Sequence, residues 1–329
     1  MLAVTGAAGF IGSALVWALN QDNYDDILLV DTLQKDERWK NLVNLKFTDF
    51  IGKDDFIVRL ECGDFDDMLD GILHMGACSS TTETDADFLL TNNYEYSRRL
   101  ALWSMEQKKR FVYASSAATY GDGSRGFSDN HATLQGLKPL NMYGYSKQLM
   151  DLWAYRNNYL DTIAGLKFFN VFGPNEYHKS DMRSVVHKAF GQIMEKGRVN
   201  LFKSHRSDYE DGKQLRDFLY VKDAVKMTLF IYSNPEVNGI FNIGTGKARS
   251  FADLVIAVFH SMNREPAIDY IDMPETLREK YQYFTQADIS KLHNAGYDKE
   301  ITCLEDGIED YVTNYLLTDD PHLGKAGAL

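Results

Sequence analysis

The chain has few cysteines, no long apolar run and no excess of positive charge, and each of these absences excludes a class of protein. The three cysteines in 329 residues, Cys62, Cys78 and Cys303, are too few and too widely spaced for a disulfide framework or a metal site. No apolar run approaches the roughly 20 residues of a membrane helix, and we expect no signal peptide before the first strand. The net charge of −12 argues against a general nucleic-acid binder, although a local basic cluster can still bind an anionic ligand. We therefore predict a cytoplasmic protein without disulfides, bound metal, nucleic-acid partner or membrane attachment.

The composition is that of a globular protein, with 44% hydrophobic and 25% charged residues. A chain of this length forms one large domain or two ordinary ones. Because no internal repeat, low-complexity linker or sharp boundary is visible, we expect two domains that interleave along the sequence.

A glycine-rich turn opens the chain. An apolar strand at residues 1–5 runs into Gly6-Ala7-Ala8-Gly9-Phe10-Ile11-Gly12, and an amphipathic helix follows over residues 13–20. Glycines at this spacing let the backbone approach a pyrophosphate, which then lies at the helix N-terminus. A second strand at 27–30 ends in Asp31, where an acid is expected to meet the adenosine ribose. The alternative is a tight turn with a capping aspartate. The predicted dinucleotide contacts are Gly6, Gly9, Phe10, Ile11, Gly12 and Asp31.

The type of dinucleotide depends on the charges near Asp31. A carboxylate there binds a ribose 2′-hydroxyl and repels a 2′-phosphate, which favours NAD. Arg38, and Lys53 after a third strand expected at 45–50, could supply the counter-charge for a phosphate. The alternative is that both are ordinary solvated cations. We predict that NADP is preferred and that NAD is usable.

Small and hydroxyl-bearing residues follow two further predicted strands. The strand at 71–75 opens into Gly76-Ala77-Cys78-Ser79, and the strand at 111–114 is followed by Ser115 to Gly121. Small residues at the carboxyl ends of parallel strands leave room for a ligand. A hydroxyl there, for which we choose Ser116, could hydrogen-bond a reacting alcohol. Strands and helices alternate over about 170 residues, which predicts an α/β fold with a doubly wound parallel sheet of Rossmann type.

Tyr143 and Lys147 stand four residues apart in a predicted helix and therefore share one face. An ammonium beside a phenol favours the phenolate and lowers the pKa of the tyrosine towards neutrality. Such a group can take a proton from an alcohol while a cofactor takes the hydride. A tyrosine and a lysine at this spacing also arise by chance, as Tyr209 and Lys213 illustrate. The functional interpretation of Tyr143 and Lys147 therefore depends on the motifs upstream.

These motifs, in this order, resemble the extended short-chain dehydrogenase/reductase superfamily, and the resemblance runs from residue 1 to about 315. Several short segments of the sequence are most similar to those of the sugar-nucleotide epimerases that act on an ADP-activated heptose. The segments that carry this similarity are 76–83, 114–121, 143–147, Phe169-Asn170-Val171-Phe172-Gly173-Pro174 and Tyr281-Gln282-Tyr283-Phe284-Thr285-Gln286-Ala287-Asp288. One departure is Met75, where we expect an acid in the family; a backbone contact to the cofactor would survive that change.

The resemblance implies a set of site residues. The catalytic residues would be Tyr143, Lys147, Ser116 and Lys179. Further cofactor contacts would be Thr32, Met75, Gly76, Ala77, Cys78, Ser79, Asn92, Lys147, Val171 and Lys179. Substrate contacts would be Ser79, Ser116, Asn170, Asp181, Lys188, Phe202, Lys203, Ser204, His205, Arg216 and Tyr281.

Three of these residues have ordinary alternatives. Lys179, in the irregular loop after Pro174, could be a solvated cation. Arg216 is the natural partner of a substrate diphosphate, but it could form a structural ion pair with Asp217 or Asp223. Tyr281 could be a half-buried aromatic.

The resemblance also implies the domain organisation. Residues 1–170 would form the NADP-binding domain, with returning segments near 215–245, and 171–329 would be mainly the substrate-binding domain. We expect helices at 181–195, 288–294 and 304–315, a mobile substrate loop at 204–213 and a disordered tail at 318–329. A homo-oligomer, specifically a pentamer, is the assembly that the resemblance implies.

The implied reaction is epimerisation of ADP-D-glycero-D-manno-heptose at C6″ for the lipopolysaccharide inner core. One alternative is another sugar-nucleotide reaction, either C4 epimerisation of a UDP-sugar or dehydration. Dehydratases of the superfamily carry an Asp-Glu pair where this chain has Ala117 and Ala118, so elimination lacks its acid. The other alternative is an NADP sensor without turnover, which the joint presence of Ser116, Tyr143 and Lys147 disfavours.

Overall fold

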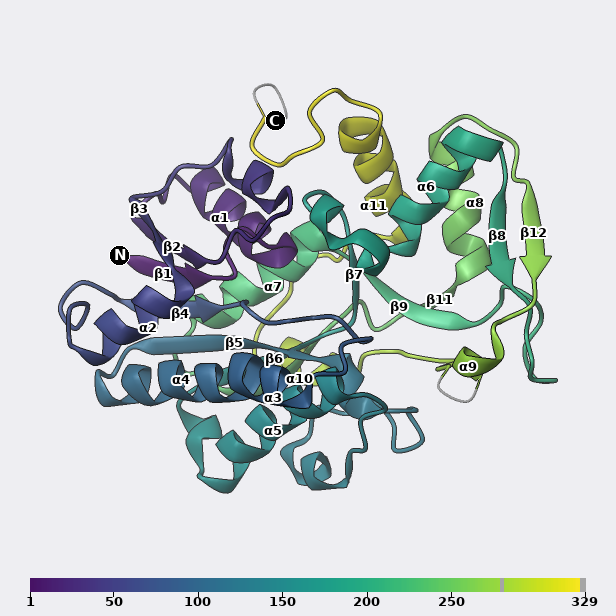
Figure 1. The fold of residues 1–329 in the computed structure, drawn as a ribbon. Coiled ribbons are helices and arrows are strands. Elements are labelled where there is room, and N and C mark those ends of the chain that lie inside the picture. Colours follow the sequence, from purple (N-terminus) through teal and green to yellow (C-terminus); the bar gives the residue numbers. More distant parts are fainter. Residues whose placement is uncertain (279–280, 326–329) are drawn as a thin grey trace.

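A computed structural model describes residues 1–278 and 281–325. Its centre is a seven-stranded parallel sheet in the order β10-β6-β5-β4-β1-β2-β3 (Figure 1). The short apolar runs of β1 and β4 are buried along their whole length, as strands covered on both faces must be. The predicted doubly wound α/β sheet is therefore confirmed. The strands of this sheet are β1 Leu2–Thr5, β2 Ile27–Asp31, β3 Asp49–Gly52, β4 Gly71–His74, β5 Arg110–Ser116, β6 Ala164–Phe168 and β10 Gly239–Ile243.

Helices cover both faces of this sheet. One face packs against α1 (Phe10–Gln21) and α7 (Val221–Ser233), which share one apolar core with β1 and β6. The other face packs against α2 (Lys53–Glu61), α4 (Tyr96–Glu106) and α5 (Met142–Arg156), which bury Phe56, Leu100 and Met150 in a second core. Between β4 and α4 lie the short α3 (Ala86–Leu89) and a π-helical turn η2 (Leu90–Glu95).

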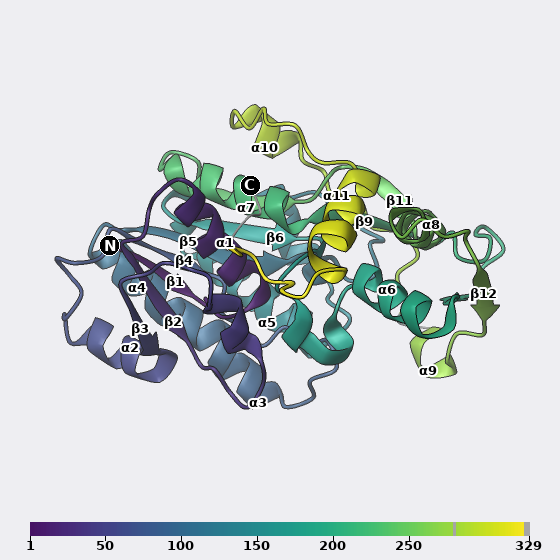
Figure 2. The ribbon, with the colours of Figure 1, turned by 90° about the horizontal axis from the view of Figure 1, so that it is seen from above.

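A smaller unit with two small sheets adjoins the carboxyl ends of the main strands (Figures 1 and 2). β9 (Leu215–Tyr220) lies between β7 (Asn170–Phe172) and β11 (Ala248–Ser250), and β8 (Val199–Phe202) pairs with β12 (Ile268–Ile271). β9 leads directly into α7, and β10 then joins the edge of the main sheet. Helices of this part of the chain are α6 Val185–Lys196, α8 Phe251–Ser261, α9 Glu275–Arg278, α10 Ser290–Asn294 and α11 Leu304–Tyr311.

Single turns complete the path: η1 Arg38–Leu42, η3 Ala117–Tyr120, η4 His131–Gly136, η5 Tyr159–Asp161, η6 Tyr177–Met182 and the π-helical η7 Val312–Leu316. None of the helices in residues 1–278 and 281–325 combines the length and the apolar character that crossing a membrane requires.

Two predicted boundaries are wrong, each because a side chain holds the backbone otherwise. The third strand starts at Asp49 rather than Leu45, because the side chain of Asn20 binds both the N–H and the carbonyl of Lys46 and keeps that segment in a turn. Helix α6 starts at Val185 rather than Asp181. Ser180 has a φ of +47°, which interrupts a helix, and the hydroxyl of Ser184 caps the new start.

The tail prediction is also corrected for residues 318–325, which we call the C-terminal strap. After η7 the chain turns back towards α1 and η1 (Figures 1 and 2). Leu323 is fully buried, and Tyr177 donates a hydrogen bond of 2.6 Å to the carbonyl of Pro321. Local composition suggested disorder, but these contacts come from segments distant in sequence. Residues 326–329 lie outside the described part of the chain.

Candidate active site

The glycine turn has the geometry of a dinucleotide cradle. Gly6 has a φ of +66°, and a Cβ there would lie 2.6 Å from the Cα of Gly76. A Cβ on Gly12 would lie 2.0 Å from the carbonyl oxygen of Gly6. Helix α1 begins after Gly9 with no side-chain cap and no acidic residue in its first turn. Its positive end therefore suits a phosphate, and the residues present fit a dinucleotide cofactor.

Asp31 lies at the end of β2, beside the turn. Its carboxylate accepts hydrogen bonds from the N–H groups of Ala8 at 2.8 Å and Thr32 at 2.7 Å. Burial nevertheless raises the pKa of this carboxyl, against the effect of those bonds. The Arg38 guanidinium is 4.0 Å away from Asp31 and forks onto Asp36 at 2.7–3.1 Å. Arg38 is therefore an ion-paired residue rather than a freely solvated cation, and sequence reasoning missed Asp36.

Lys53 and Asn92, both predicted cofactor contacts, touch each other. Lys53 opens α2 directly after Gly52, which pairs with Asp31 across β2 and β3. Its ammonium donates to Oδ1 of Asn92 at 2.5 Å and lies over the ring of Tyr96. Lys53 is therefore held by Asn92 and Tyr96, one residue after the strand position that pairs with Asp31.

The segment after β4 is held by one buried amide. The side chain of Asn93 accepts from the N–H of Cys78 at 2.8 Å and donates to the carbonyl of Cys78 at 2.9 Å. The same amide donates to the hydroxyl of Ser146 at 3.0 Å, and Ser146 donates to the carbonyl of Tyr143. Asn93 thus ties the predicted cofactor loop to the tyrosine helix. The signal we missed was a polar residue on the apolar face of a helix.

A buried polar chain continues from Asn93 to the glycine turn. Its members are Thr5, His74 and Ser97, joined at 2.5 Å and 2.7 Å, and Ser97 donates to the carbonyl of Asn93 at 2.7 Å. Burial lowers the pKa of His74 to about 3, so the imidazole is neutral. These hydrogen-bonded side chains therefore carry no charge and hold Asn93 and the glycine turn in fixed positions.

The structure brings Tyr143, Lys147 and Ser116 together. Asn141 caps α5 by accepting from the N–H of Gly144 at 2.8 Å, which sets the helix start. Lys147 donates to the carbonyl of Ala114 at 2.7 Å, and burial lowers the pKa of its ammonium to about 8. The expected fall in the pKa of Tyr143 is wrong for this state. Burial raises it, and a hydrogen bond with Ser116 only partly opposes the rise.

One turn beyond Lys147, Asp151 forms a fully buried ion pair that sequence reasoning missed. Its carboxylate lies 3.0 Å from the ammonium of Lys167 and accepts from Tyr113 at 2.9 Å and Ser115 at 2.8 Å. Lys167 also donates to Thr119 at 2.5 Å. The pair therefore connects β5, β6, η3 and α5, which are the elements around Ser116 and Tyr143.

Lys179 lies in η6 with its ammonium 5.3 Å from the centre of the Phe10 ring, at the first residue of α1. Burial lowers the pKa of this ammonium, and the nearby carboxylate of Glu176 partly opposes the change. Lys179 is half-buried, and its position over the Phe10 ring disfavours the freely solvated alternative. Val171, at the middle of β7, is half-buried, whereas Asn170 and Ser79 are exposed.

Arg216 is the buried cation of the smaller unit. Only 7% of its surface is exposed, its guanidinium lies over the rings of Phe251 and Tyr281, and it donates to the carbonyls of Leu215 and Gln282. In residues 1–278 and 281–325 no carboxylate lies within 4.0 Å of it. Asp217 binds Thr245 and Gly246, and Asp223 binds Lys226. The structural ion-pair alternative is therefore wrong.

An open hollow of about 550 Å³ lies at this end of the site, beside Tyr281. Phe202 packs edge-on against Tyr281 at 6.4 Å, and the N–H of His205 donates to Tyr283 at 3.0 Å. The N–H of Ser204 donates to Asp211 at 2.7 Å, which orders the start of the predicted mobile loop. The residues lining the hollow are His205, Arg206, Arg278, Tyr281 and Tyr283.

Three predicted substrate residues form contacts on the surface instead. Lys188 donates to the carbonyl of Asp181 at 2.6 Å, and both residues are exposed. Lys203 forms an exposed ion pair of 3.2 Å with Asp272. The described contacts do not bring these cations to Arg216 or to Tyr143.

Comparison with known proteins gives a consistent result. Residues 2–244 match the NAD dependent epimerase/dehydratase family. The chain is 59% identical over 323 residues to the ADP-L-glycero-D-manno-heptose-6-epimerase of Nitratidesulfovibrio vulgaris, covering 98% of this chain and 100% of that protein. The enzyme of the same name from Fusobacterium nucleatum is 48% identical over 332 residues, with 98% and 100% covered.

A solved structure agrees with the sequence relatives. The crystal structure of Helicobacter pylori ADP-L-glycero-D-manno-heptose-6-epimerase superposes with a TM-score of 0.80 at 26% identity, and 95% of each chain is covered. The chain described here therefore belongs to the NAD dependent epimerase/dehydratase family and, within it, to the ADP-L-glycero-D-manno-heptose-6-epimerases.

Proposed function

We propose that this isomerase of lipopolysaccharide inner-core heptose biosynthesis inverts C6″ of ADP-D-glycero-D-manno-heptose through a transient ketone. The observation that carries the proposal is the convergence of Ser116, Tyr143 and Lys147 at the strand ends, with the buried ammonium of Lys179 at the head of α1. Ser116, Tyr143 and Lys147 can therefore bind and deprotonate the alcohol. Lys179 is a separate ammonium beside the helix that would hold the cofactor.

The cofactor in this proposal is a tightly held NADP, with NAD usable. It would be held by the glycine turn, by Asp31 and by Asn93 through the Cys78 loop. Arg38 and Lys53 would face the 2′-phosphate. When bound, the nicotinamide accepts a hydride from C6″ and later returns it.

Tyr143 acts in the oxidation half of the reaction. Its phenolate takes the hydroxyl proton as the C6″ hydride leaves, which produces the ketone. The Ser116 hydroxyl hydrogen-bonds the reacting oxygen. Burial keeps the resting phenol protonated, so formation of the base depends on the nearby Lys147 ammonium and on bound ligands.

Lys179 acts in the reduction half. A cofactor held by the glycine turn would present one face to the substrate, so the sugar would have to turn before the ketone is reduced from its opposite face. The carbonyl oxygen then needs a proton donor away from Tyr143, and burial already lowers the pKa of Lys179. After the reaction Tyr143 is protonated and Lys179 is neutral. Proton exchange with solvent, or the reverse reaction, restores both.

Arg216 would bind the substrate diphosphate. A guanidinium held by rings and carbonyls, with no carboxylate partner among the described residues, has a charge available for an anion. The adjacent hollow at Tyr281 and His205 would receive the nucleotide part. From the family resemblance we further propose a homo-oligomer, a pentamer, in the bacterial cytoplasm, which light scattering on the purified protein would test.

The decisive test is incubation with ADP-D-glycero-D-manno-heptose, with the stereochemistry of the product read by NMR. We expect inversion at C6″ alone. Conversion of UDP-galactose to its C4 epimer, with no reaction of the heptose, would favour the C4 alternative and contradict the proposal.

A further inference from the structure

The loop that carries Lys179 is anchored by a buried asparagine four residues earlier. Asn175 has no exposed surface and a φ of +76°, a conformation that few residues other than glycine and asparagine adopt readily. Its amide donates to the hydroxyl of Ser13 in α1 at 2.9 Å. The oxygen of the same side-chain amide, Oδ1, accepts a hydrogen bond of 3.0 Å from the N–H of Leu323. The loop is thereby tied both to the cofactor helix and to the C-terminal strap.

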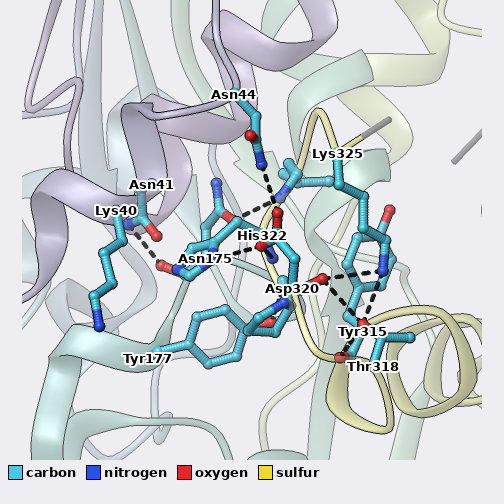
Figure 3. A network of polar contacts seen from close by, with 12 residues as sticks. Lys40, Asn41, Asn44, Asn175, Tyr177, Tyr315, Thr318, Asp320, His322 and Lys325 are labelled. Carbon is cyan, nitrogen blue, oxygen red and sulfur yellow. Dashed lines mark hydrogen bonds and ion pairs between the residues drawn. The ribbon is translucent and has the colours of Figure 1, made fainter. Parts of the chain in front are cut away.

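A second asparagine joins the same loop to the glycine turn. The amide of Asn41, which is 2% exposed, donates to the carbonyl of Ala8 at 2.9 Å and to the carbonyl of Asn175 at 3.0 Å. It also approaches the ring of His178 at 3.4 Å. Figure 3 shows Asn175 between Asn41, which belongs to η1, and His322 of the strap.

The strap closes over this junction. Asn44 donates to the carboxylate of Asp320 at 2.9 Å, and Tyr177 packs edge-on against His322 at 5.3 Å (Figure 3). Gly324 has a φ of +82°, and a Cβ there would lie 2.8 Å from the carbonyl oxygen of Asn44. The strap therefore touches the segment after β2 and the η6 loop at the same time.

Without the strap, the buried side-chain oxygen Oδ1 of Asn175 would lose the donor that Leu323 supplies, whereas the backbone carbonyl would keep Asn41. A buried acceptor without a partner is costly, so the amide would turn or the loop would open to water. Only one turn of chain separates Asn175 from Lys179, and the N–H of Lys179 already bonds to the carbonyl of Glu176. A movement at Asn175 therefore carries Lys179 away from Phe10.

We propose that the C-terminal strap positions Lys179, and that Leu323 is the positioning residue that does so through Asn175. The catalytic meaning of this inference rests on the proposed role of Lys179, but the position itself can be measured without turnover. Both measurements are made on the full protein with its cofactor bound.

The variants form two matched pairs. Truncation after Leu317 removes the strap, and truncation after Lys325 is its control. Leu323→Pro removes the N–H that Asn175 accepts, fixes the backbone φ and replaces the buried leucine side chain, while the rest of the strap stays in place. Its control is Lys325→Ala, because Lys325 binds Thr318 and the carbonyl of Asp320 but does not touch Asn175.

The first readout is the rate at which a soluble acylating reagent labels each lysine, followed by peptide mass spectrometry. We expect labelling of Lys179 to rise roughly tenfold in Leu323→Pro and in the truncation after Leu317. Labelling of Lys147, and of Lys179 in both controls, should stay unchanged. Unchanged labelling of Lys179 in Leu323→Pro would overturn the proposal, as would an equal rise at Lys147, which would indicate general loosening.

The second readout is kcat for epimerisation, measured beside Lys179→Met. We expect kcat to fall at least tenfold in the strap variants. If labelling rises but Lys179→Met and Leu323→Pro both keep normal kcat, the positioning stands and the two-base mechanism fails. If the truncated protein does not fold, Leu323→Pro decides.

Discussion

At Tyr143 two effects oppose each other, and the structure shows which is larger. The nearby ammonium of Lys147 was expected to lower the pKa of the phenol. In the structure that ammonium is held on the carbonyl of Ala114, and loss of water from around the phenol raises the pKa instead. A phenol with a raised pKa stays protonated at rest and becomes a base only with ligands bound.

Tyr143→Phe keeps the ring and removes the proton that is transferred. We expect the cofactor to stay bound and turnover to fall by ~10²–10⁴-fold, the usual effect of losing a positioned acid or base. Lys147→Met should reduce both turnover and cofactor retention. Turnover is measured by NMR and bound cofactor by mass spectrometry. Near-normal turnover of Tyr143→Phe would remove the phenol from the mechanism.

Lys179→Met separates proton donation from anion binding. If Lys179 is the second donor, kcat should fall by ~10²–10⁴-fold, as for Tyr143→Phe. If the ammonium only pairs with the diphosphate, KM should rise and kcat should be spared. Steady-state kinetics of the variant distinguishes the two, and an unchanged kcat at saturating substrate contradicts the two-base mechanism.

The preference for NADP that we propose depends on how much of the Arg38 charge Asp36 already neutralises. We expect NADP to be released from the purified protein, with NAD also able to bind. Asp36→Asn should free the guanidinium and increase the ratio of NADP to NAD affinity, since Asp36 is its closest partner. Gln34→Ala is the matched control, because it removes a neutral contact of the same guanidinium at 3.0 Å. Recovery of NAD alone from the unmodified protein would overturn the preference.

Among the elements, α5, β5 and β6 meet at the buried pair of Asp151 and Lys167, one turn from Lys147. The Asp151 charge raises the pKa of Lys147, while burial lowers it to about 8 as the larger effect. The ammonium of Lys147 therefore loses its charge as the pH rises through about 8. The charge state of Lys147 in α5 therefore depends in part on Asp151, one turn further along the same helix.

The pH profile of kcat/KM should show both the loss of the Lys147 charge and the influence of Asp151 on it. We expect activity to fall on the alkaline side near pH 8, where Lys147 deprotonates. Lys167→Met removes a positive neighbour and should move that limb to higher pH. The double variant Asp151→Asn with Lys167→Met removes the carboxylate as well. Its alkaline fall in activity should therefore occur at a lower pH than that of Lys167→Met alone. Identical limbs in all three proteins would show that Asp151 does not act on Lys147.

For the whole molecule, buried neutral histidines link folding to pH. The pKa of His74 is lowered to about 3, and burial is the main cause. Between pH 6.5 and 3 the unfolded chain binds a proton here that the folded chain does not. The free energy of unfolding must therefore fall as the pH falls through that window. His131, His178 and His187, whose pKa values are each lowered to about 4, act in the same direction.

His74→Asn keeps a donor and an acceptor in the chain from Thr5 to Ser97 but does not titrate. We expect the pH dependence of stability between pH 6.5 and 4 to weaken by up to about 1.4 kcal/mol per pH unit, the effect of one proton. Urea unfolding at several pH values measures this. The variant is less stable overall if the new side chain packs poorly, so the slope is compared rather than the absolute value. Equal slopes would mean that His74 is not neutral in the folded state.

The sequence by itself determined the features that depend on short stretches of chain. The glycine turn, the acid after β2 and the spacing of Tyr143 and Lys147 follow from local backbone geometry, and with the resemblance they predicted the fold and the reaction. Only the tertiary structure decided the distant partners: Asp151 for Lys167, Asn93 for Cys78, and a strap residue for Asn175 from 148 positions away. The physical reason is that the charge, the pKa and the position of a buried group depend on every segment packed against it, and most of those segments are distant in sequence.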